Sequence, residues 1–417
     1  MTYIEFFDKT VIENICACLT AVPRRVILIG DKRRLLTEHA QRYAALFESR
    51  GKQVEFICRL VNKNDVRSIV AVLTEIVQNE EQCAIDLTGG EELYLLATGI
   101  VFERFPEYHL QMHRFNIRNN TIVDVDQDGK TIFEGHLPML SVEENIRIYG
   151  GDVIYDSTDR LGTHLYGSSP ELFSEIDRIW RIAAEYQTKW NLLTMMVLYA
   201  GQAAGPGGDP LTVEVSMDRL NRVLAQNGLK YFHAPYILRA LQAEHLVREY
   251  DVGSERFFVQ FRDPLVRQCL EKAGLILELK IYAAAVRAKD TDGEPVYNDV
   301  QTGVLINWKG DGNTTPAETR NEVDVMMMKG MVPVFVSCKN GFVEREELYK
   351  FSTVAERFGG KYARKILVAP ALSLSTSPEY IEQRAAEMGI QIVEDVWTLD
   401  EEALERRVRS FWNQNLR

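Results

Sequence analysis

The sequence feature that most constrains the fold is a regular alternation of predicted strands and helices over residues 25–115. Strands are predicted at Arg25–Gly30, Gln53–Cys58, Cys83–Leu87 and His109–Phe115, and helices at Arg33–Arg50, Asp65–Gln78 and Glu91–Phe105. Consecutive parallel strands need a helical crossover, so this order indicates a parallel sheet wound with helices on both faces. Residues 1–150 are therefore predicted to form a doubly wound α/β domain.

Two loops at the carboxyl ends of these strands suit a phosphate or nucleotide ligand, because doubly wound sheets bind ligands at that edge. Glycines there let backbone N–H groups approach an anion at a helix N-terminus. A tight strand-to-helix turn would explain the same glycines, so both interpretations stay open. No G-x-G-x-x-G follows the first strand, which disfavours an ordinary NAD or FAD domain. The candidate ligand-binding residues are Gly30, Asp31, Lys32, Thr88, Gly89, Gly90 and Glu91.

The C-terminal part, residues 274–417, predicts a different order of elements, α-β-β-β-α-β. A helix opens at Gly274 and runs through Lys289, and the later elements are strands Val300–Trp308, Glu322–Met327 and Val332–Cys338, helix Arg345–Phe358 and strand Ile366–Ala369. The second and third strands are joined by a Lys329-Gly330 turn and form a predicted hairpin.

Polar side chains gather on one face of that hairpin, because strand side chains alternate between faces. Glu322 and Asp324 share one face of their strand, and Ser337 and Lys339 share one face of theirs. Carboxylates hold Mg²⁺ or Mn²⁺, and a neighbouring lysine orients water and offsets charge in phosphodiester hydrolysis. From the spacing alone, an edge hairpin with a solvated polar face is equally compatible.

Residues 151–273 are predicted to form a linker and a winged-helix-like connector. The predicted elements are helices Leu172–Tyr186, Trp190–Ala200, Met217–Gln226 and Pro235–Glu244 and a hairpin of Val247–Tyr250 with Arg256–Phe261. A winged helix reads DNA with its second helix, but Pro235–Glu244 carries only Arg239 as a basic residue. A rigid connector or dimer spacer is the favoured interpretation.

The charge of the 417-residue chain limits its partners. A formal net charge of −12 argues against binding of duplex DNA by a wide basic surface. A nuclease of this composition would need local basic residues, for which Lys361, Arg364 and Lys365 are the candidates. The chain contains no apolar run of membrane-spanning length and no signal-peptide pattern at its start, so a cytoplasmic protein without membrane contact is expected.

The C-terminal part resembles the PD-(D/E)xK nuclease superfamily in its order of elements and in its polar residues. The resemblance assigns Asp324 to the acid of the second strand, Lys339 to the lysine and Glu278 to the acid of the first helix. Ser337 occupies the position of the second acid, which is a departure from the pattern. Either Glu322 or Glu347 replaces that acid, with the Cys338 carbonyl completing the Mn²⁺ or Mg²⁺ shell, or the domain is an inactive copy.

Nearly the whole chain resembles the CARF-domain nucleases of type III CRISPR systems, which cyclic oligoadenylate switches on. The segments that carry the resemblance are RVILIGDKR, DLTGGEELYLLATG, NEVD and FVSCKNG. It implies a Rossmann-like CARF domain, a restriction-endonuclease-like domain in which SCK replaces ExK, and a homodimer. The resemblance implies cyclic oligoadenylate as the activator, with cyclic tetra-adenylate expected and the ring size left open; a ring of four has a two-fold axis that a symmetric dimer can match. The expected substrate is DNA, RNA or both.

Two other functions stay open at this point. The chain is also compatible with a ligand-responsive transcription regulator whose nuclease-like domain is inactive. It is further compatible with a ring nuclease, which would degrade the messenger in its N-terminal pocket.

Overall fold

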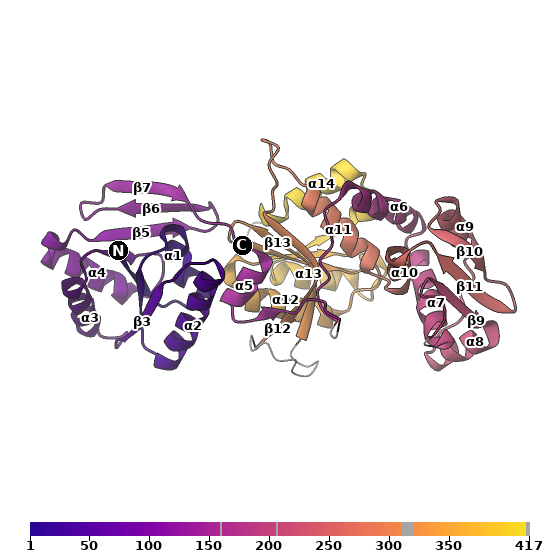
Figure 1. The fold of residues 1–417 in the computed structure, drawn as a ribbon, viewed down its shortest axis with the longest axis horizontal. Coiled ribbons are helices and arrows are strands. Elements are labelled where there is room, and N and C mark those ends of the chain that lie inside the picture. Colours follow the sequence, from indigo (N-terminus) through magenta and orange to yellow (C-terminus); the bar gives the residue numbers. More distant parts are fainter. Residues whose placement is uncertain (159–160, 206, 310–319, 414–417) are drawn as a thin grey trace.

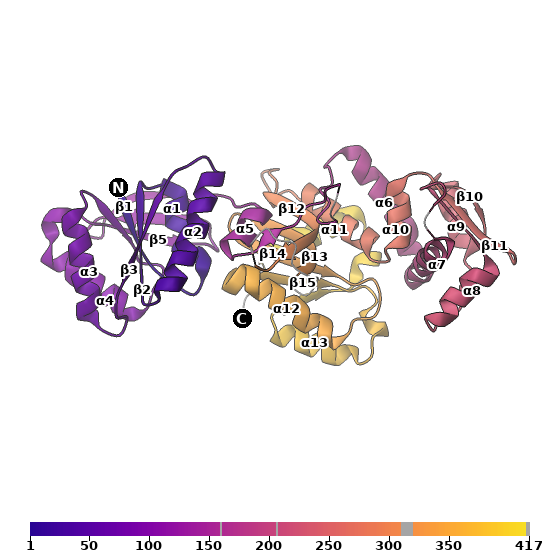
Figure 2. The same ribbon diagram turned by 60° about the horizontal axis from the view of Figure 1, so that its bottom comes forward.

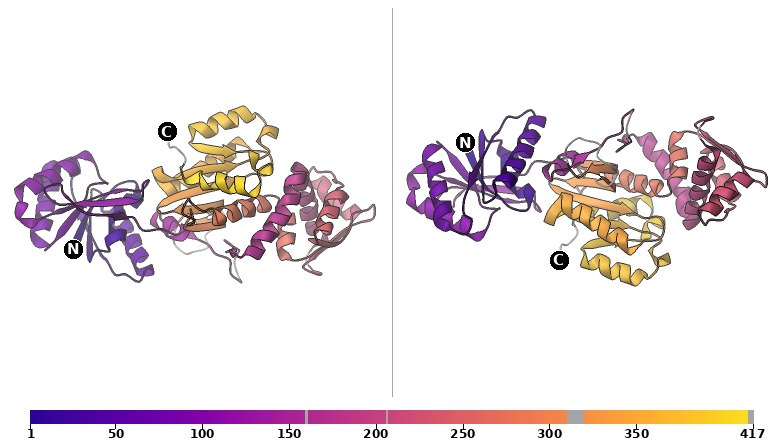
Figure 3. Two further views of the ribbon diagram at one scale, coloured as in Figure 1. Left: turned by 90° about the horizontal axis from the view of Figure 1, so that it is seen from above. Right: turned by 90° about the horizontal axis from the view of Figure 1, so that it is seen from below.

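The computed structural model describes residues 1–158, 161–205, 207–309 and 320–413. They form three units in a row, with the α/β domain built mainly from residues 275–413, here called the middle domain, between the N-terminal domain and the connector (Figure 1). The views from above and below in Figure 3 give the same order. The chain runs from the first unit past the second to the third, and then returns to complete the second. None of the helices in these ranges combines the length and the apolar character needed to cross a membrane.

The N-terminal domain is the predicted doubly wound sheet, with strand order β3-β2-β1-β4-β5-β6-β7. Helices α1 and α2 pack into the hydrophobic cluster on one face of the sheet, and α3 and α4 into the cluster on the other. Its elements are β1 (Thr2–Phe6), α1 (Cys16–Ala21), β2 (Arg25–Gly30), α2 (Arg33–Ser49), β3 (Glu55–Leu60), α3 (Val66–Asn79), β4 (Cys83–Asp86), α4 (Glu92–Arg104), β5 (Gln111–Asn116), β6 (Thr121–Val125) and β7 (Thr131–His136).

An interior strand of this sheet, β1, is an element that the sequence pattern missed. It pairs in parallel with β2 on one side and with β4 on the other, and all of its residues are buried. A run of TYIEF with a buried Glu5 gives no clear hydrophobic strand signal on its own. The antiparallel strands β6 and β7 were missed as well.

The middle domain has the predicted α-β-β-β-α-β order, built on a sheet of order β16-β15-β14-β13-β12-β8. Helix α11 lies on one face of the sheet and α12 on the other (Figure 2). Its elements are α5 (Val142–Ile148), β8 (Asp152–Val153), α11 (Leu275–Arg287), β12 (Asp299–Asn307), β13 (Arg320–Lys329), β14 (Val332–Cys338), α12 (Arg345–Gly359), β15 (Arg364–Val368), α13 (Pro378–Glu387), β16 (Ile390–Val393) and α14 (Glu401–Arg409).

The connector has winged-helix-like architecture, as the sequence predicted, with a third strand, β9, added to the hairpin. Its elements are α6 (Pro170–Tyr186), α7 (Thr188–Ala204), β9 (Thr212–Ser216), α8 (Met217–Gln226), α9 (Pro235–Ala243), β10 (Val247–Asp251), β11 (Arg256–Phe261) and α10 (Pro264–Glu271). Helix α10 leads directly into α11 of the middle domain.

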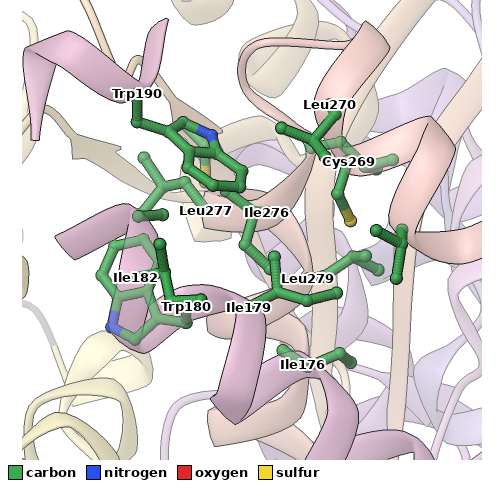
Figure 4. Packing of buried hydrophobic residues seen from close by; sticks show 14 of the residues in the cluster. Ile176, Ile179, Trp180, Ile182, Trp190, Cys269, Leu270, Ile276, Leu277 and Leu279 are labelled. Carbon is green, nitrogen blue, oxygen red and sulfur yellow. The ribbon is translucent and has the colours of Figure 1, made fainter. Parts of the chain in front are cut away.

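One hydrophobic cluster joins the connector to the middle domain. Trp190 of α7 is fully buried and lies in the same cluster as Leu277 of α11, and helices α6 and α10 pack around them (Figure 4). The cluster continues to Val336 on β14 and Leu404 on α14. The middle domain therefore shares its core with the connector rather than ending at a clean boundary.

We expect Trp190→Ala to lower the free energy of unfolding by about 3–5 kcal/mol, because it opens a large cavity in this shared core. Leu192→Ala is the matched control, since Leu192 lies on the same helix and is 38% exposed. Urea unfolding followed by circular dichroism measures both changes. Equal effects of the two substitutions would contradict a shared core centred on Trp190.

Candidate functional site

The predicted ligand loops lie at one edge of the N-terminal sheet. Strand β1 separates β2 from β4, so Gly30 and Asp31 after β2 and Gly89 and Gly90 after β4 flank the end of β1. A Cβ added to Gly30 would lie 3.2 Å from Phe7 Cβ, just past the end of β1. The structure therefore brings the two loops together, with the segment after β1 as a third component that the sequence did not reveal.

Gly90 is required by its backbone and by its neighbours. Its φ is +95°, a conformation that favours glycine, and an added Cβ would lie 2.9 Å from Phe6 Cβ. Gly89 approaches the Phe6 carbonyl in the same way, at 3.2 Å from an added Cβ. The tight turn and the ligand loop are thus compatible interpretations of the same two glycines.

Some of the predicted ligand residues use their side chains within the protein. The Thr88 N–H donates to Asp86 Oδ1 at 2.7 Å, and Thr88 Oγ1 accepts from the Phe115 N–H at 3.0 Å. Glu91 forms an ion pair with Lys63 at 2.6 Å. What these loops offer an anion is therefore backbone N–H groups and the exposed ammonium of Lys32, whereas the exposed Asp31 carboxylate would repel it.

The N-termini of α2 and α4 also favour an anion at this edge of the sheet. Lys32 and Glu91 occupy the N-cap positions of the two helices, and neither side chain makes a capping hydrogen bond. Uncapped N–H groups and the positive end of the helix dipole favour a negatively charged ligand. The edge is thus chemically suited to phosphate groups.

The second candidate site is centred on Asp324 of β13, which meets the end of β14. Its Oδ2 accepts from the Cys338 backbone N–H at 2.6 Å and lies 3.3 Å from Ser337 Oγ. Asp324, Ser337 and Lys339 line one cavity of about 140 Å³ with Glu322 and Glu347. The sequence prediction that these side chains share a face is confirmed.

Lys339 is held between two carboxylates. Its Nζ lies 3.0 Å from Glu347 Oε2 on α12, and Asp324 lies on its other side. Burial lowers the pKa of Lys339, but Asp324 and Glu347 outweigh this effect, so the pKa is raised and the ammonium form is favoured. In this arrangement Glu347 therefore pairs with Lys339 and is not a free ligand for a metal ion.

Glu278 of α11 is the most deeply buried carboxylate of the site, at 3% exposure. Burial and the nearby Asp324 raise the pKa of Glu278 to about 7, while Lys272 opposes the shift. Burial also raises the pKa of Asp324, against the Cys338 N–H and Lys339, which lower it. The fold thus holds two like charges close together in a poorly solvated place.

Lys272, which the sequence did not reveal, bridges two of the predicted acids. Its Nζ lies 2.9 Å from Glu322 Oε1 and 3.3 Å from Glu278 Oε2. It caps the end of α10, so the connector supplies a cation to the middle domain. A residue so far from the hairpin in the sequence leaves no local pattern by which to find it.

The chemistry of these donors fits a divalent cation in part. Among the described residues, no three His, Cys, Asp or Glu side chains are grouped closely enough to hold a metal ion by themselves. Mg²⁺, however, is usually bound by one or two carboxylates together with water and substrate phosphate oxygens. Asp324 and Glu278 are oxygen donors whose mutual repulsion a cation would relieve. The Cys338 thiol is buried in the core cluster, so only its carbonyl could serve.

The prediction that a nucleic-acid substrate is bound by Lys361, Arg364 and Lys365 is wrong. Arg364 and Lys365 are buried at 5% and 8% exposure. The Arg364 side chain donates to the Trp412 carbonyl at 2.8 Å, and Lys365 Nζ pairs with Glu356 at 3.0 Å. Lys361 forms an ion pair with Glu13 of the N-terminal domain at 2.8 Å. These cations hold the fold together, because position in a charged run does not determine which way a side chain points.

Comparison with solved structures establishes the fold. Searches of family models and of curated proteins found no match to the sequence. Protein VC1899 from Vibrio cholerae matches 99% of this chain and 98% of its own, with 17% identity and a TM-score of 0.73. Can2 from Sulfobacillus thermosulfidooxidans, solved in complex with cyclic tetra-adenylate, matches 99% of both chains with 18% identity and a TM-score of 0.67. The chain therefore shares the α/β fold of these proteins along nearly its whole length.

We expect the buried Glu278 to make stability depend on pH. Its pKa is about 7 in the folded protein and 4.5 in the unfolded chain, so the folded state binds more protons between these values. The free energy of unfolding therefore falls as pH rises from 4.5 to 7. Glu278→Gln should flatten this slope in urea unfolding without metal, with Glu48→Gln at an exposed carboxylate on α2 as control. An unchanged slope in Glu278→Gln would contradict the assignment.

Proposed function

We propose that this protein is a metal-dependent nuclease of the CARF type, switched on by cyclic tetra-adenylate. The observation that carries the proposal is the convergence of Asp324 and Glu278 beside Lys339, where β13 and β14 meet. Two carboxylates and an ammonium are the groups that phosphodiester hydrolysis uses. The fold shared with Can2, solved with cyclic tetra-adenylate, supports this activator.

In this proposal the residues of the chain have distinct roles. Asp324 and Glu278 would hold Mn²⁺ or Mg²⁺, which would make water a better nucleophile at neutral pH. The Cys338 N–H fixes the orientation of the Asp324 carboxylate, as its 2.6 Å hydrogen bond indicates. Lys339 orients the attacking water and offsets negative charge at the phosphate, and Glu347 holds that ammonium in place. Ser337 positions Asp324 instead of binding the metal, because its hydroxyl already lies beside the carboxylate.

A homodimer is part of the proposal, since a four-membered ring of adenylates can contact the same loops of two copies. Binding at the N-terminal domain would shift the population towards a cutting-competent state. The substrate is DNA or RNA, and the lack of a broad basic surface favours single strands over duplex.

A buried contact between the domains offers a route for this control. Glu13, 3% exposed, follows the end of β1 and contacts both Lys361 and the Tyr362 hydroxyl. These partners come directly after α12, the helix whose first turn carries Glu347. A displacement of the segment after β1 would therefore shift α12, the helix whose Glu347 pairs with Lys339.

Lys339→Ala should lower the rate of cleavage by about 100-fold or more, because it removes charge stabilisation at the reacting phosphate. The assay contains Mn²⁺ with single-stranded DNA, RNA or plasmid, with and without cyclic tetra-adenylate. Lys289→Ala is the control, since Lys289 is exposed in the same domain and does not line the cavity that contains Asp324 and Lys339. Binding of cyclic tetra-adenylate should survive both substitutions. Cleavage by Lys339→Ala at the normal rate would refute the assignment of the site.

Glu13→Gln should weaken activation while leaving ligand binding intact, because it removes the charge that Lys361 contacts. Activation by cyclic tetra-adenylate is expected to fall by about 5-fold or more, the lower end of ordinary allosteric coupling. Calorimetric titration measures binding, and the cleavage assay measures activation. Glu48→Gln, a change at an exposed carboxylate on α2, is the control. Full activation in Glu13→Gln would exclude this contact as the route.

A further inference from the structure

A second cavity, of about 440 Å³, opens beside the candidate catalytic site. Glu278 and Glu322 line it, and Glu322 also lines the cavity that contains Asp324 and Lys339. Its outer wall is a segment that we call the strap, residues 154–158 and 161–168, which leads from β8 to α6. The sequence had suggested only a linker here.

The strap is fixed to the middle domain by several hydrogen bonds. Thr163 is 1% exposed, its N–H donates to the Ile154 carbonyl at 2.7 Å, and its Oγ1 accepts from the Leu305 N–H at 2.8 Å. The Tyr282 hydroxyl donates to the Tyr166 carbonyl at 3.0 Å. A segment tied at both strand β12 and helix α11 presents its side chains in fixed positions.

Two ring side chains of the strap line this cavity. His164 and Tyr166 lie edge to face, with ring centroids 4.6 Å apart, and the His164 side chain is 61% exposed. Proteins that bind single-stranded nucleic acid stack bases on aromatic rings of this kind. The ordering of the strap means that little entropy is lost when a base is bound.

The charges around the cavity select the part of a nucleotide that can enter. Asp156, Glu271, Glu278 and Glu322 line it, against the ammonium of Lys272. Lys272 is already paired with Glu322 and Glu278. A phosphate group would meet net negative charge, whereas a nucleobase is uncharged and planar. The cavity therefore suits a base, while the phosphate stays beside Lys339 and the cation that Asp324 and Glu278 would hold.

We propose that this cavity binds the nucleobase adjacent to the phosphate that is cut, stacked on Tyr166. The inference rests on the proposed nuclease function and specifies its substrate. A base can enter a side cavity only when it is unpaired and unstacked, so the site selects single strands or locally opened duplex.

The test measures binding separately from cutting. With cyclic tetra-adenylate present, fluorescence anisotropy follows a labelled DNA single strand binding to the Lys339→Ala protein. Tyr166→Ala in that protein should weaken binding by about 5- to 100-fold, the range for loss of a base-stacking ring. Tyr166→Phe, which keeps the ring, should bind as before. Leu165→Ala is the control on the same strap, because Leu165 is 62% exposed and points away from this lining.

A DNA strand that carries an abasic nucleotide then shows which base of the strand occupies the cavity. Replacing nucleotides one at a time should weaken binding most at one position, and there Tyr166→Ala should cause no further loss. If Tyr166→Ala caused the same additional loss at every abasic position, the inference would be overturned. Unchanged binding by Tyr166→Ala would overturn it as well. A strand that binds through Tyr166 without being cut by the unmodified protein would instead overturn the nuclease proposal and leave the base site standing.

Discussion

The electrostatic conflict between Glu278 and Asp324 is the constraint around which the middle domain is arranged. Two carboxylates that repel each other in a poorly solvated place cost folding free energy, and the surrounding structure offsets this cost at several points. The Cys338 N–H stabilises Asp324, and Lys272 lies beside Glu278. A packed core on both faces of the sheet keeps the two groups from moving apart. Such an arrangement has a chemical use, because a cation can stabilise both groups at once.

The three units are interdependent because each contributes side chains to a neighbour. The connector provides Lys272 to the acids of the middle domain, and the N-terminal domain provides Glu13 to the end of α12. Asn191 of α7 and Asn340, the residue after Lys339, hydrogen-bond to each other, with Asn340 Nδ2 donating to Asn191 Oδ1 at 2.8 Å. The connector is therefore more than a spacer, since two of its helices contact the surroundings of the candidate catalytic residues.

The features that could be predicted from the sequence are those that depend on the pattern of neighbouring residues. Strand and helix alternation was enough for the N-terminal fold, and period-two alternation correctly put Asp324 and Lys339 on one face. Strand β1 was missed because a five-residue run with an internal Glu5 resembles a polar segment, although burial between two strands decides its structure. Glu13 was missed because its partners lie far away in the chain, and Lys272 because its bridge to Glu322 spans 50 residues. Arg364 and Lys365 were misassigned because a charged side chain in a strand can point inward when a partner is present.

The pairing of β8 with β12 bears on how the protein is made. Asp152 and Val153 pair with Asn307 and Ile306, so this part of the catalytic sheet cannot form until translation has passed the connector. The N-terminal sheet, by contrast, is complete once β7 has left the ribosome. Under the proposed function, an interrupted chain could be a sensor without a nuclease, but never a nuclease without its sensor.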